Sequence, residues 1–206
     1  MRELMKKVLM AVAMLFFFAG SMGFFSITAQ AKNADDAAAL DGVKKDAYNV
    51  TIKKDGVVLD GYDLTGYGVY IEVNNAVVKN CTGVKYVIIE GGHTGVEVSN
   101  NTIVGPKEIG IYVLSDNSTV TGNTITGITE TAITANSVSN CKISQNTIIG
   151  HMGHYAIYTE YGKNNEISDN IIKNSYHYGM VVTNDDGSVI TYLWFSPERW
   201  DGMLKN

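Results

Sequence analysis

Residues 96–127 read VEVSNNTIVGPKEIGIYVLSDNSTVTGNTITG and contain the unit N-T-I-x-G twice, ending at Gly105 and at Gly127. Related units end at Gly66, Gly83, Gly150 and Asn174. After one short repeat the spacing is about 22–24 residues, a period at which self-similarity is typical of a solenoid. In such a fold each repeat forms one coil that stacks on its neighbours.

Three columns of apolar residues recur in register when the repeats are aligned. They are Val98, Val120, Ile143, Ile167 and Ile190; Ile103, Ile125, Ile148 and Ile172; and Ile88, Ile111, Ile133, Ile157 and Met180. Each member lies in a short β-branched segment with apolar alternation, bounded by Gly, Asn, Ser or Asp, which is the pattern of a strand. No repeat has the spacing of a helix. We therefore predict an all-β fold, a parallel β-helix (solenoid) of about six to seven coils.

A column of asparagines supports the same fold. Its predicted members are Asn80, Asn101, Asn123, Asn146 and Asn170. Side-chain amides stacked in this way can hydrogen-bond to one another along the axis of the solenoid. The alternative is glycosylation at the sequons that begin at Asn80 and Asn117, but the in-register spacing favours the ladder.

The N-T-I-x-G unit, together with the strands G-I-Y-V and A-I-Y-T, resembles the right-handed parallel β-helix proteins related to pectate lyases. The resemblance covers about residues 50–192 and implies a right-handed solenoid. That family includes polysaccharide lyases, mannuronan epimerases, glycoside hydrolases, phage tailspikes and non-enzymatic surface proteins. It therefore implies extracellular polysaccharide as the partner but no single activity. The epimerase signature D-P-H-D is absent, and no catalytic residue of the family can be carried over.

Residues 1–31 have the organisation of a secretory signal peptide. Arg2, Lys6 and Lys7 precede the apolar run Val8–Gly20, and Ala29–Ala31 is a small-x-small cleavage site. An uncleaved membrane anchor is the alternative. We expect a secreted or cell-surface protein that does not associate with the membrane after cleavage.

The solenoid, predicted over residues 50–192, needs covers because an open coil end is an exposed sheet edge. We assign residues 32–49 and 193–206 to this role, with short helices over Ala34–Lys45 and Ser196–Lys205. A chain that is part of a longer protein is the alternative to a C-terminal cap.

Charge and cysteine content limit the possible partners. The whole chain carries a net charge of −5, and removal of the predicted signal, which carries +2, leaves −7. This balance argues against nucleic acid. Cys81 and Cys141 should lie three coils apart, too far for a disulfide, and act as buried thiols. We expect a monomer without a cofactor, except that Ca²⁺ could be required if the substrate is a polyuronate.

The dipeptide His-Tyr recurs at residues 154 and 177 because the coil recurs. The histidines fall in the column that lies three places before Ile111 and its equivalents. If the strands alternate strictly, this column and two others face outward. The three columns are Lys85, Glu108, Glu130, His154 and His177; Val87, Gly110, Ala132, Ala156 and Gly179; and Ile89, Tyr112, Thr134, Tyr158 and Val181. They predict a shallow trough with a small-residue floor, an ionisable wall and a tyrosine wall.

Such a trough suits an extended glycan. Tyr112, Tyr158 and Glu160 are the candidate substrate-binding residues, and Glu108, Glu130, His154 and His177 are the candidate catalytic residues. The two glutamates should lie about 5 Å apart, near the separation in a retaining glycosidase, and their mutual repulsion would raise the pKa of one of them. Either histidine could abstract the proton next to a uronate carboxyl.

Two alternatives are open for the ionisable column, and two classes are open for the whole protein. The ionisable column can be a solvated edge whose charges pair with one another, or His151, His154 and His177 can bind a metal. The protein as a whole can be a carbohydrate-active enzyme (polysaccharide lyase, epimerase or glycoside hydrolase) or a non-catalytic surface, adhesion or structural module.

Overall fold

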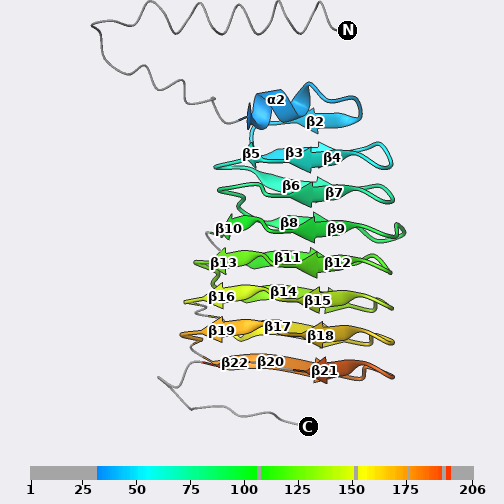
Figure 1. Cartoon of the computed structure of the whole chain (residues 1–206), viewed down its shortest axis with the longest axis vertical. Helices are drawn as coiled ribbons and strands as arrows, with labels where there is room; N and C mark the ends of the chain where they lie inside the picture. Colours follow the sequence, from blue (N-terminus) through cyan, green and yellow to red (C-terminus); the bar gives the residue numbers. More distant parts are fainter. Residues whose placement is uncertain (1–31, 106–107, 151–152, 176, 192–193, 196–206) are drawn as a thin grey trace, which may run out of the picture. The chain divides into compact units, whose positions relative to one another are not determined.

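The computed structural model describes residues 32–105, 108–150, 153–175, 177–191 and 194–195, which form a parallel β-helix (Figure 1). Sheet 1 contains, in spatial order, β2 (Val43–Lys45), β3 (Asn49–Ile52), β6 (Gly68–Ile71), β8 (Val87–Ile89), β11 (Ile109–Val113), β14 (Thr131–Asn136), β17 (Tyr155–Glu160) and β20 (Tyr178–Thr183). Sheet 2 contains β4 (Val58–Asp60), β7 (Val77–Lys79), β9 (Glu97–Ser99), β12 (Thr119–Thr121), β15 (Lys142–Ser144), β18 (Glu166–Ser168) and β21 (Val189–Thr191). Sheet 3 contains β10 (Thr102–Val104), β13 (Thr124–Thr126), β16 (Thr147–Ile149), β19 (Ile171–Lys173) and β22 (Trp194–Phe195). The predicted fold class is confirmed.

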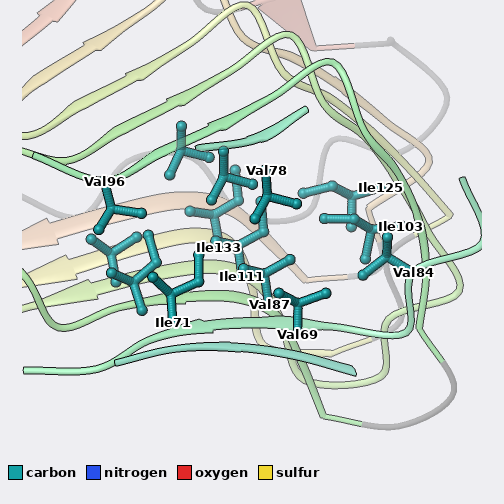
Figure 2. Close-up of a cluster of buried hydrophobic side chains, with 14 of the residues drawn as sticks. Val69, Ile71, Val78, Val84, Val87, Val96, Ile103, Ile111, Ile125 and Ile133 are labelled. Carbon is teal, nitrogen blue, oxygen red and sulfur yellow. The ribbon is translucent and has the colours of Figure 1, made fainter. Parts of the chain in front are cut away.

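The apolar columns form the core between the sheets (Figure 2), except that Ile190 in the last coil is exposed. The column from Val98 to Ile190 and the column from Ile103 to Ile172 pair from coil to coil as predicted. In the third column one member is wrong, because Val87 and not Ile88 pairs with Ile111. Val87 and Ile89 are fully buried, whereas Ile88 is only partly buried.

The first coils are shorter than the predicted repeat. Val50 pairs with Val69, and Val69 pairs with Val87, so that each of these two coils uses fewer residues than the later ones. From Val87 onward the spacing agrees with the prediction, since Ile111 pairs with Ile133 and Ile133 pairs with Ile157.

The asparagine ladder is present at four of its five predicted positions. Asn101, Asn123, Asn146 and Asn170 are buried. Asn123 donates from its main-chain N–H and from its side-chain amide to Oδ1 of Asn146, at 3.0 Å each. The same side-chain amide also donates to the carbonyl of Val98 in the preceding coil, at 2.9 Å. The amides of Asn101 and Asn146 likewise bond to the coils on both sides, so each of these three amides connects three coils.

Asn80 does not belong to the ladder. Its place is taken by Cys81, whose N–H donates to Oδ1 of Asn101 at 2.9 Å. Asn80 is exposed in a turn with a φ of 54°, and its side chain donates to Asp60. Asn117 is also exposed, with the same φ of 54°. The asparagines of both sequons thus lie outside the ladder, and the ladder does not account for their spacing.

Both cysteines are free and buried, as predicted. Cys141 starts a second, shorter ladder, in which its N–H donates to Oδ1 of Asn165 at 2.9 Å. Each thiol points toward a carbonyl of an earlier coil, Cys81 Sγ at 3.8 Å from that of Leu59 and Cys141 Sγ at 3.4 Å from that of Ser115. A cysteine therefore replaces an asparagine at the head of each ladder, with its thiol in place of the amide donor.

The N-terminal end of the solenoid is covered by a short helix and an antiparallel strand. The helix α2 (Ala34–Ala38) begins with a capping box between Asn33 and Asp36, and its two buried alanines join the core. The expectation that this helix continues to Lys45 is wrong. After Gly42, which has a φ of 83°, β2 pairs antiparallel with β3. β1 (Lys32–Asn33) pairs with β5 (Tyr62–Asp63).

Two predicted segments lie outside the described residues, namely the signal over residues 1–31 and the helix over Ser196–Lys205. Where the structure does describe the chain, none of its helices is both long and apolar enough to cross a bilayer.

We expect Asn146→Leu to lower the free energy of unfolding by ~1–3 kcal/mol, because the buried main-chain N–H of Asn123 loses its acceptor. Asn136→Leu is the matched control, since Oδ1 of Asn136 has no hydrogen-bond partner. Urea unfolding followed by circular dichroism measures both variants. Equal midpoints for the two variants would contradict this role of the ladder.

Burial raises the pKa of the Cys141 thiol to about 11, above the value of ~8.5 for an unfolded chain. The native state therefore holds this proton more tightly than the unfolded state. The resulting stabilisation is complete below pH ~8.5 and is lost as the pH rises to about 11. We expect the free energy of unfolding to fall more steeply over this range in the unmodified protein than in Cys141→Ala, as measured by urea unfolding at each pH. Parallel curves would rule out the effect.

Candidate functional site

The predicted site residues lie on the strands β11 and β17 of sheet 1 or directly before β11, β14, β17 and β20. These four strands do not alternate strictly. In each pair of neighbouring strands, the residue-to-residue pairing skips one position. Ile109 pairs with Thr131 and Ile111 with Ile133, and no pair forms between Gly110 and Ala132. The same gap recurs in the next two strand pairs. Each of these strands therefore bends at this point, and in β11, β14 and β17 the small residue turns inward and is buried.

The predicted small-residue floor is consequently wrong. Ala132 and Ala156 are fully buried. A Cβ atom on Gly110 would lie 2.6 Å from the carbonyl oxygen of Ala132 and 3.1 Å from Cγ2 of Ile125, a core residue. Small side chains are needed here because neighbouring coils approach closely at the bend. They are a packing feature of the interior and do not line a trough.

Two columns of sheet 1 face outward on either side of the bend. The first contains Ile109, Thr131, Tyr155 and Tyr178, and the second contains Ile88, Tyr112, Thr134, Tyr158 and Val181. Ile88 takes the place predicted for Ile89, which is buried, and the same one-residue shift removes Lys85 from the ionisable column. Tyr112 and Tyr158 lie on the outward face as predicted, and both are half-buried.

Three tyrosines form a stacked cluster at the C-terminal end of this face. The ring centroid of Tyr155 lies 4.9 Å from that of Tyr158 and 5.8 Å from that of Tyr178, with interplanar angles of 20° and 24°. All three side chains are half-buried. Offset or tilted aromatic pairs at such distances attract one another, so the rings are held in fixed orientations. We call Tyr155, Tyr158 and Tyr178 the C-terminal tyrosine cluster.

Glu160 orients one ring of this cluster. The hydroxyl of Tyr158 donates to Oε2 of Glu160 at 2.6 Å. This hydrogen bond to a carboxylate is the main reason that the pKa of Tyr158 is raised above its ordinary value, with burial as the second cause. Near the end of β17, Thr159 Oγ1 donates to Asp185 at 2.6 Å, and in the turn that follows the N–H of Gly162 donates to the same carboxylate. The end of β17 and the turn after it are thereby fixed.

The four candidate catalytic residues line the same edge of sheet 1, one per coil. Glu108, Glu130, His154 and His177 are all exposed. The main-chain N–H of Glu130 donates to the carbonyl of Glu108 at 3.2 Å, so these two residues are neighbours along the axis. The rings of His154 and His177 are stacked with centroids 5.7 Å apart. His154 also lies against Tyr155, with the ring centroids 6.0 Å apart, which connects this edge to the tyrosine cluster.

The metal-binding alternative involves one residue, His151, that lies outside the described part of the chain. Within the part that the structure describes, no three His, Cys, Asp or Glu side chains gather in an arrangement that could hold a metal ion.

Sequence reasoning missed Tyr155 and Tyr178. Strict alternation from Ile157 and Met180 places both of them on the inner side of the sheet, whereas the bend turns them outward. The signal that could have found them is the recurrent His-Tyr dipeptide. A tyrosine that recurs in register beside an exposed histidine predicts that the tyrosine also lies on the surface.

Comparison with known proteins agrees with the geometry. A family model described as the right-handed beta helix region matches residues 62–193. The chain therefore belongs to the right-handed β-helix family. No curated protein sequence matches it significantly.

Proposed function

We propose that the protein is a secreted or cell-surface β-helix that binds extracellular polysaccharide on the outward face of sheet 1. The observation that supports this most directly is the C-terminal tyrosine cluster, in which Tyr155 stacks on both of its partners. Aromatic rings offer an apolar face and a polar rim, which matches the apolar faces and hydroxyl rim of a sugar ring. Rings already held in place lose little conformational entropy on binding.

Polar groups that can bind sugar hydroxyls surround the cluster. Glu160 lies at one side, and the exposed rings of His154 and His177 lie at the other. Carboxylate oxygens accept hydrogen bonds, and a neutral imidazole both donates and accepts. Because the small residues are buried in the interior, the face is not recessed where the sequence predicted a floor. This geometry favours binding over cleavage.

We expect Tyr158→Ala to weaken binding of a polysaccharide ligand about ten-fold, or ~1.4 kcal/mol, because one ring of the C-terminal tyrosine cluster is lost. A glycan array on the protein without residues 1–31 identifies the ligand, and isothermal titration then measures the affinity. Tyr161→Asn is the control, since Tyr161 is 63% exposed in the turn after β17 and has a φ of 54°, which asparagine tolerates. An equal loss in the two variants would contradict a site on sheet 1.

A second candidate function is cleavage of the bound glycan. It is favoured by the adjacency of Glu108 and Glu130 and by the stacked histidine pair one and two coils further along. An acid beside a carboxylate is the arrangement of a glycosidase, and a histidine can serve as a general base.

If the protein is an enzyme, we expect Glu130→Gln and His154→Ala to reduce turnover at least a hundred-fold while affinity changes little. General acid–base groups contribute ~10²–10⁴-fold to rate, whereas affinity depends mainly on the tyrosines. Release of reducing ends or of unsaturated products from the ligand identified above measures turnover. Binding without turnover in the unmodified protein would select the adhesion or structural function. Turnover that survives both substitutions would move the active site elsewhere.

A further inference from the structure

The outward tyrosine column extends from the C-terminal cluster toward the N-terminal end of sheet 1 as far as β6. Tyr70 pairs with Ile88, Ile88 with Tyr112, Tyr112 with Thr134, and Thr134 with Tyr158. A tyrosine thus occupies every second coil, on β6, β11 and β17. Because neighbouring strands lie ~4.8 Å apart, successive tyrosines are ~10 Å apart and the whole column spans ~19 Å. We call Tyr70, Tyr112 and Tyr158 the tyrosine track.

A second aromatic pair lies at the N-terminal end of the track. The rings of Tyr70 and Tyr86 meet edge to face with their centroids 6.0 Å apart. The hydroxyl of Tyr86 donates to Oδ1 of Asn49 at 2.7 Å. Its ring lies over Gly68, where an added Cβ atom would overlap it. As at the other end, the rings are held in place by neighbours on other coils.

Carboxylates predominate along both sides of the track. Glu108 and Glu130 lie on one side. On the other side, Glu72 and Glu90 follow the ends of β6 and β8, and Glu160 is the last residue of β17. Glu72 is paired with a cation, since Lys53 Nζ lies 2.7 Å from its Oε2. The chain as a whole also carries a net charge of −5. Like charges facing one another across an interface reduce affinity, so this face opposes a polyanion.

We infer that the ligand is an uncharged glycan chain that lies along the solenoid axis. It contacts the C-terminal tyrosine cluster and the pair formed by Tyr70 and Tyr86, the N-terminal aromatic cluster, at the same time. This inference rests on the proposed function and narrows its substrate class. A ligand must extend over ~19 Å to reach from Tyr70 to Tyr158, which requires several sugar rings and excludes a mono- or disaccharide. Of the chemistries that the sequence allows, hydrolysis is compatible with this ligand, whereas lyase and epimerase reactions on uronates are not.

The first test compares glycans of different charge and length by isothermal titration. The probes are β-1,4-linked glucose, mannose and N-acetylglucosamine oligosaccharides from disaccharide to octasaccharide, with oligogalacturonates of the same lengths. We expect the affinity for at least one uncharged series to rise steeply until the chain spans both clusters and then to level off. We expect the uronates to bind at least ten-fold more weakly at low salt, with a smaller difference at high salt because the repulsion is screened.

The second test separates the two ends of the track. We expect Tyr70→Ala and Tyr158→Ala each to weaken binding of the octasaccharide about ten-fold, or ~1.4 kcal/mol. For the disaccharide, which can use either cluster, each variant should lose no more than about two-fold, because one of two alternative sites remains. Tyr161→Asn again serves as the control, and circular dichroism confirms that each variant is folded.

The outcomes distinguish this inference from the proposed function. Loss of octasaccharide binding in Tyr158→Ala but not in Tyr70→Ala would overturn the axial placement and leave a local glycan site. Uronates that bind as tightly as the uncharged series would overturn the assigned substrate class. If none of the oligosaccharides and no glycan on the array binds the unmodified protein, the proposed function itself is wrong.

Discussion

Buried hydrogen bonds connect each coil of the asparagine ladder to the next and hold the two in register. A very short strand has too little length to specify its own register, and a coil with three such strands could slip against its neighbour. The amide ladder prevents this, because Asn123 is bonded to Asn146 by two donors and to the coil before it by a third contact. Each ladder amide is buried, so a slip of one residue would leave several polar groups without partners. Register is therefore set by polar groups inside the core, and the apolar columns fill the space that remains.

The surface of sheet 1 follows from a second constraint, the close approach of coils at the bend. Gly110, Ala132 and Ala156 occupy that position and are buried. At Gly110 a side chain would meet the backbone of the next coil and Ile125 of sheet 3. Turning the small residue inward breaks the alternation and brings the preceding residue to the surface. This is how Tyr155 and Tyr178 come to stack beside Tyr158. A feature of interior packing thus decides which side chains form the candidate binding face.

The solenoid places residues that repeat in the sequence at even intervals along its axis. Residues one coil apart are neighbours in space, so the same sheet aligns tyrosines over several coils and places carboxylates along both of its sides. An extended polymer is the natural ligand for a surface that is periodic in one direction. Under the proposed function, the carboxylates beside the tyrosines would disfavour a polyanionic polymer. The stacked histidines add a pair of groups that can bind hydroxyls or move protons.

The sequence by itself determined the β-helix, two of the three apolar columns, four members of the asparagine ladder and the alignment of the four ionisable residues on one edge. These features repeat at nearly constant spacing, and such a period can be detected in the sequence without a structure. The register in the early coils could not be read from the repeats and is seen only in the folded protein. There Val87, Ile88 and Ile89 are all β-branched, and either Asn80 or Cys81 could head the ladder. The tertiary structure also decided the outward face, because a bend that reverses alternation depends on how closely the neighbouring coil approaches. That approach is a property of two coils packed together, and no single repeat contains it.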